Sequence, residues 1–186
     1  MLRILTTCRR TAGRLALVVG VIAMAAARPT AAGDLRLIQA VKNRDHGAVS
    51  ALLRERVNVN EPQPDGATAL HWAIYLDDAE MTDLLIRSGA NVRAANDLGI
   101  TPLLMACMNA NPAIAEKLLA AGADPNSALE SGETALMLAS RSGSVAAVNM
   151  LIARGANVNA RESTGGQTAL MGAVNNTHPE IARVLL

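Results

Sequence analysis

The chain has 186 residues, about half of them hydrophobic, and aromatic side chains are almost absent, with no Phe, one Trp and one Tyr. This mixture of small and aliphatic residues is typical of a protein built from closely packed helices. The formal net charge of +1 averages over a basic start, because residues 1–27 hold four of the 17 basic residues and none of the 16 acidic ones. The remainder carries a net charge of −3 and no basic run, which argues against nucleic acid as a partner.

The N-terminal segment, 1–27, has the features of a secretory signal peptide. Four arginines accompany a 13-residue apolar run at 15–27, which contains small residues at Ala25 and Ala27 and is followed by Arg28. The run is shorter than the roughly 20 apolar residues of a membrane-spanning helix, and an uncleaved anchor is the alternative. We expect cleavage after residue 27, or as late as residue 32. This predicts an exported mature chain, periplasmic or secreted, without stable membrane insertion.

A regular repeat organises the rest of the chain. One motif recurs at nearly equal steps, as TALHWA at Thr68, TPLLMA at Thr101, TALMLA at Thr134 and TALMGA at Thr168. A second motif, in phase with the first, begins at Gly89, Gly122 and Gly155. Each Thr is suited to open a helix as its N-cap, and each Gly to end one in a left-handed conformation. Each unit is therefore predicted to be a helix, a turn, a second helix and a loop.

This pattern resembles the ankyrin repeat, whose signature includes T-P-L-H-x-A and a closing G-A-D/N-V-N, and the resemblance covers roughly residues 34–186. It implies an all-α ankyrin-repeat solenoid of stacked helix–turn–helix units with hairpin-like loops. We assign about five repeats, at approximately 34–64, 65–96, 97–129, 130–163 and 164–186. The first is degenerate, with Arg56 where later repeats have Gly. The last is incomplete, which we interpret as a C-terminal truncation.

The His and Cys residues after the signal segment form no pattern typical of an active site. His46, His71, His178 and Cys107 lack the spacing of a nucleophile with its base or of a metal-ligand set. Cys107 follows a core alanine, which favours a buried filler, and the methionines are explained as helix packing better than as copper ligands. The family resemblance implies that His71 ties neighbouring repeats together by hydrogen bonds. We expect no catalytic residue, no metal, no cofactor and no enzymatic activity.

The resemblance also implies where a partner binds, on the concave side formed by the first helices and the loop tips. In the family, the adaptable surface positions are the residue before the alanine that ends each Thr motif and those two and three after it. The candidates on this sequence are Trp72, Tyr75, Leu76, Met105, Met108, Asn109, Leu138 and Arg141. Trp72 and Tyr75 lie three residues apart on one helix face, and such side chains are enriched at binding hot spots. The alternative is that both rings fill space between repeats.

These features favour a non-enzymatic scaffold or adaptor that recognises another protein on its concave ankyrin surface, outside the cytoplasm. Two alternatives remain open at the level of sequence. The chain could be an effector delivered to a host cell, or the ankyrin module of a longer protein whose enzymatic domain lies beyond residue 186.

Overall fold

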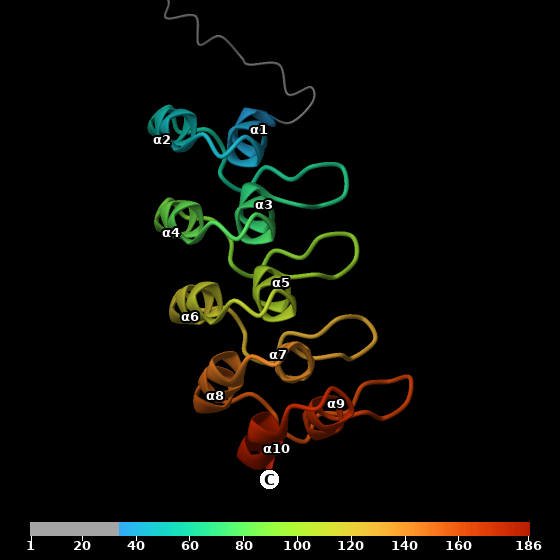
Figure 1. The fold of residues 1–186 in the computed structure, drawn as a ribbon. Helices are drawn as coiled ribbons and strands as arrows, with labels where there is room; N and C mark the ends of the chain where they lie inside the picture. The colour runs from blue at the N-terminus through green and yellow to red at the C-terminus, as the bar shows by residue number, and fades with distance from the viewer. Residues whose placement is uncertain (1–33) are drawn as a thin grey trace, which may run out of the picture. The chain divides into compact units, whose positions relative to one another are not determined.

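The computed structural model describes residues 34–186, which contain ten helices arranged in five pairs (Figure 1). The first helices of the pairs are α1 (Arg36–Lys42), α3 (Ala69–Tyr75), α5 (Pro102–Met108), α7 (Ala135–Ser142) and α9 (Ala169–Asn175). The second helices are α2 (His46–Arg54), α4 (Ala79–Arg87), α6 (Pro112–Ala120), α8 (Val145–Ala153) and α10 (Pro179–Leu185). The expected signal peptide lies outside the described residues.

The helices of residues 34–186 stack in two layers. Each odd-numbered helix contacts the next odd-numbered one, and α4, α6, α8 and α10 contact one another in turn. The loops between pairs project beside the odd-numbered helices (Figure 1). The one β-type pairing in this part of the chain is an isolated bridge between Ala128 and Thr134. The architecture confirms the predicted all-α solenoid, and none of its helices is long and apolar enough to cross a bilayer.

Side-chain caps explain where the helices begin. The hydroxyl groups of Thr101, Thr134 and Thr168 each accept a hydrogen bond from the backbone N–H three residues on, at 3.3–3.4 Å. Helices α2 and α4 begin after Asp45 and Asp78, whose carboxylates accept from the corresponding N–H groups at 2.8 and 2.9 Å. The predicted capping role of these three threonines is therefore confirmed.

Left-handed residues follow the second helices, as the glycine motif predicts. Gly89, Gly122 and Gly155 have φ angles of 88°, 92° and 88°, which are sterically open to a residue without a Cβ. In the first repeat Arg56 takes the same place with a φ of 59°. The degenerate repeat thus follows the same backbone path, with the steric penalty of a side chain in the left-handed region.

Aliphatic side chains from both layers form one continuous core. The alanine that ends each Thr motif is completely buried at Ala73, Ala106, Ala139 and Ala173. Such a small side chain lets successive odd-numbered helices pack closely. With the core filled in this way, the outer faces of the odd-numbered helices and the loops beside them are left to meet other molecules.

Candidate functional site

The His and Cys side chains within residues 34–186 are each buried or hydrogen-bonded within the stack. No group of three His, Cys, Asp or Glu side chains in this part of the chain is placed to hold a metal ion. Cys107 is completely buried, and burial raises the pKa of its thiol to about 12. The thiol therefore stays protonated and shielded, which confirms the interpretation of Cys107 as a buried filler.

His71 lies inside the stack and joins two repeats. The backbone N–H of Thr68 donates to its Nδ1 at 3.2 Å, so the ring proton is on Nε2, which donates to the backbone oxygen of Ile100 at 3.0 Å. Burial lowers the pKa of the imidazole below its ordinary value, which keeps the ring neutral. The implied role of His71, a hydrogen-bonded tie between neighbouring repeats, is confirmed.

The predicted surface residues differ widely in exposure. Four of the eight are exposed, namely Tyr75, Met108, Asn109 and Arg141. Three others are half-buried, namely Trp72, Leu76 and Met105. Tyr75 is the most open of the apolar members, with 64% of its surface exposed, and Met108 follows with 45%.

Leu138 is the exception, and its predicted place on the surface is wrong. Its side chain is only 2% exposed, because α7 packs between α5 and α9. Leu138 instead forms the floor of a hollow that Met108, Arg141 and Ser142 also line. Leu138 therefore supports the residues that line this hollow and offers almost no area for contact with a partner.

Trp72 points partly inward and partly outward. Its ring meets that of Tyr75 edge to face, with centroids 5.5 Å apart and an interplanar angle of 78°. The ammonium group of Lys42, from the preceding repeat, lies 3.9 Å from the centroid of the same indole. The indole N–H is buried and has no hydrogen-bond partner among the described residues. Trp72 thus packs against the core while part of its ring remains at the surface.

A pocket of about 170 Å³ opens where the loops meet α3 and α5. We call it the aromatic pocket. Its lining residues are Asp65, Ala67, His71, Trp72, Tyr75, Asn96 and Met105. Sequence reasoning identified Trp72, Tyr75 and Met105 but missed Asp65 and Asn96, which come from two different loops. The sequence has a turn-forming Asp65-Gly66 pair in the first loop, yet nothing in the sequence places that loop beside the second.

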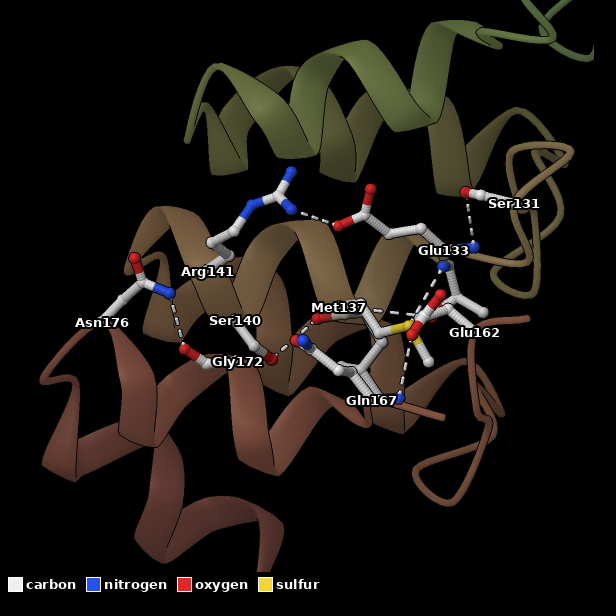
Figure 2. A network of polar contacts seen from close by, with 11 residues as sticks. Ser131, Glu133, Met137, Ser140, Arg141, Glu162, Gln167, Gly172 and Asn176 are labelled. Atoms are coloured by element: carbon white, nitrogen blue, oxygen red, sulfur yellow. Dashed lines mark hydrogen bonds and ion pairs between the residues drawn. The ribbon is translucent and has the colours of Figure 1, made fainter. Parts of the chain in front are cut away.

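The part of the candidate surface on α7 and α9 consists mainly of polar side chains (Figure 2). Arg141 donates to Glu133 at 2.5 Å in an exposed ion pair, and the amide nitrogen of Asn176 donates to the backbone oxygen of Gly172 at 2.9 Å. These residues and Glu162 line a polar hollow of about 60 Å³. The candidate surface therefore has an apolar part on α3 and α5 and a polar part on α7 and α9.

Comparison with protein families agrees with this architecture. A family model of ankyrin repeats, comprising three copies, matches residues 37–129 and 113–186. No curated protein matches the chain. Ankyrin repeats are typically non-enzymatic modules for protein–protein interaction, so they indicate a protein as the partner. The family match and the stacked helix pairs lead to one conclusion: the chain belongs to the ankyrin-repeat family.

Proposed function

We propose that this chain is a non-enzymatic scaffold or adaptor that binds a partner protein on the face formed by the odd-numbered helices and the loops beside them. One observation carries the proposal. Trp72, Tyr75 and Met105 line one pocket, and exposed Met108 lies one helical turn beyond Met105 on α5, so that apolar and aromatic side chains gather on one part of this face. Clustered Trp, Tyr and Met side chains at a surface are typical of protein recognition sites.

The division of this face into two parts supports the same proposal. Binding surfaces commonly combine a desolvated apolar centre with a polar rim. Trp72 and Met105 line the aromatic pocket and supply such a centre, while the ion pair of Arg141 with Glu133 and the side chain of Asn176 supply polar groups farther along the stack. A partner that follows the stack would meet both.

The proposed place of action is outside the cytoplasm, in the periplasm or the extracellular medium. The support is the basic, acid-free start and the 13-residue apolar run of residues 1–27. An exported chain has envelope or extracellular proteins as its available partners. The partner is therefore to be sought among those proteins.

Affinity capture tests the proposed surface. The wild-type protein, Tyr75→Ala and Val145→Ala are immobilised, and each is exposed to the same envelope extract of the source organism. Val145 is a matched control, because it is an exposed apolar residue on α8, in the other helix layer. We expect proteins that are retained by the wild type and by Val145→Ala but lost with Tyr75→Ala. Identical sets captured by all three proteins would contradict the proposed surface.

A further inference from the structure

Charge is distributed unevenly between the loops and the helices. The four loops beside the odd-numbered helices, here called the loop edge, are residues 58–67, 91–100, 124–133 and 157–167. They contain seven acidic and two basic residues. The helices and short turns of residues 34–186 contain nine acidic and ten basic residues, so their charges nearly cancel. The negative charge of the folded part therefore lies on the loop edge.

Three carboxylates at successive turns of the loop edge have no cationic partner. No Lys, Arg or His among the described residues forms an ion pair with Asp65, Asp97 or Glu130, and all three are exposed. The backbone N–H of Asp97 donates to the backbone oxygen of Asp65 at 2.9 Å, which places the first two turns side by side. Asp65 and Asp97 thus put two negative charges on neighbouring turns, where like charges repel one another, and a cation from a partner would relieve that repulsion.

The aromatic pocket lies directly beside these carboxylates. Asp65 is one of its lining residues, and Asn96, the neighbour of Asp97, is another. Trp72, Tyr75 and Met105 line the same pocket. The pocket therefore combines apolar and aromatic walls with a carboxylate at one side.

Long basic side chains match this combination. Arg and Lys bury an aliphatic stem along apolar surface while the charged end stays at a polar boundary, and Trp and Tyr rings attract cations. The protein contains an example within its own fold, since the ammonium of Lys42 lies 3.9 Å from the centroid of the Trp72 ring. Lys42 itself does not line the aromatic pocket, so the pocket can accept a second basic side chain from a partner.

We infer that the partner presents a basic segment to this surface, with an Arg or Lys whose aliphatic stem enters the aromatic pocket and whose charge meets Asp65 and Asp97. The inference rests on the proposed function and adds the chemistry of the partner to it. Hydrophobic neighbours of that Arg or Lys would cover Tyr75 and Met108. An acidic segment would meet the unpaired carboxylates of the loop edge and be repelled.

Peptide selection tests the inference without knowledge of the natural partner. A random library of displayed dodecapeptides is selected against the wild-type chain, with Tyr75→Ala as the counter-selection. Sequences enriched only on the wild type are expected to contain Lys or Arg next to aliphatic residues. The tightest peptide is then titrated while the fluorescence of Trp72, the single Trp of the chain, is followed as a signal from the pocket.

Charge variants separate a local effect from a change of net charge. The double variant Asp65→Asn/Asp97→Asn keeps the shape and an accepting oxygen of each side chain but removes both charges. We expect it to bind the selected peptide about tenfold more weakly at low salt, because one or two charge contacts at the rim are lost. The matched control is Glu80→Gln/Glu116→Gln, which removes two exposed carboxylates from α4 and α6 in the other layer. The control should bind within about twofold of the wild type, since these charges lie away from the pocket.

Two results would overturn the inference. One is Tyr75-dependent enrichment of peptides that lack Lys and Arg, and the other is unchanged affinity of Asp65→Asn/Asp97→Asn. Either would leave the proposed protein-binding surface in place and remove only the basic partner. A selection with no Tyr75-dependent enrichment at all would count against the surface itself and so against both proposals.

Discussion

The rings of Trp72 and Tyr75 form an edge-to-face pair, 5.5 Å between centroids, in which one ring is packed against the core and the other is open to solvent. The two residues come from one turn of α3, yet their surroundings differ. Trp72 is held from below by the core and covered on one face by Lys42. Tyr75, at 64% exposed, presents most of its surface outward. Substitutions at the two positions should therefore separate binding from stability.

Tyr75→Ala is expected to weaken partner binding by about 2 kcal/mol, the range of aromatic hot spots, while lowering the free energy of unfolding by only about 1 kcal/mol. Trp72→Ala should weaken binding too, but it should also lower the free energy of unfolding by about 3 kcal/mol, because part of the ring packs in the core. Partner titration and thermal melting followed by circular dichroism measure the two effects. Tyr75→Phe is the control that keeps the ring. An unfolded Tyr75→Ala protein would contradict this division of roles.

His71 is expected to make stability depend on pH. Burial lowers its pKa in the folded state, so in the pH window just below about 6.5, the ordinary pKa of His, the unfolded chain binds a proton and the folded protein does not. Stability therefore falls as the pH is lowered through this window. His71→Leu should remove this part of the dependence and cost about 1–3 kcal/mol at pH 7, because the N–H of Thr68 and the oxygen of Ile100 lose their partner. Urea unfolding at several pH values gives the free energy of unfolding of each protein as a function of pH. If that free energy changed equally with pH in the wild type and in His71→Leu, the assignment of the dependence to His71 would be refuted.

Cys107 is expected to resist thiol reagents while the protein is folded. Its pKa of about 12 and complete burial leave almost no accessible thiolate at neutral pH. The measurement is labelling with a chromogenic disulfide reagent after Cys8→Ser has removed the other cysteine of the chain. The same protein in concentrated urea is the control for full reactivity. We expect the native rate to follow the rate of unfolding. Fast labelling without denaturant would show that the thiol is open to solvent.

The last described repeat is expected to be the least stable part of the C-terminal half. Helix α10 contacts α8 and α9, and Leu186 at its end is 93% exposed, with Val174 and Val184 exposed as well. In a solenoid, stability comes largely from nearest-neighbour interfaces. Adding one polar capping repeat should raise the melting temperature, by about 2–4 °C for each kcal/mol added to the free energy of unfolding. It should also slow hydrogen exchange of the amides in α10. A Gly/Ser tail of equal length is the control, and equal melting temperatures would contradict the expectation.

Export is expected to remove the N-terminal segment. Protein recovered from the envelope or the medium should begin near Arg28, or near Gly33 if cleavage occurs at the later position. N-terminal sequencing of the recovered protein provides the test. A variant with two acidic residues inside the apolar run serves as the control and should remain uncleaved. Intact Met1 on the wild-type protein found in the cytoplasm would contradict the proposed export.

The sequence by itself determined the repeat, the helix pairs and the fold family. Capping by Thr101 and the left-handed turn at Gly89 depend on residues within one turn of each other, so a local pattern is enough to predict them. The regular period of the motifs then dictates that the pairs stack, because a single pair cannot bury its apolar face alone. For the same reason Tyr75 and Met108 could be placed on the surface from their position within the repeat.

Only the tertiary structure decided how neighbouring repeats meet. It buried Leu138 under its neighbours, placed Lys42 on the ring of Trp72, and brought Asp65 beside Asn96 in the aromatic pocket. Each of these relationships joins side chains of different repeats or of successive loops, and each depends on the lateral offset of one repeat against the next. The repeat period predicts only that two units are neighbours. The offset, which decides whether a given side chain is covered or open, is set by the packing of all the side chains between them.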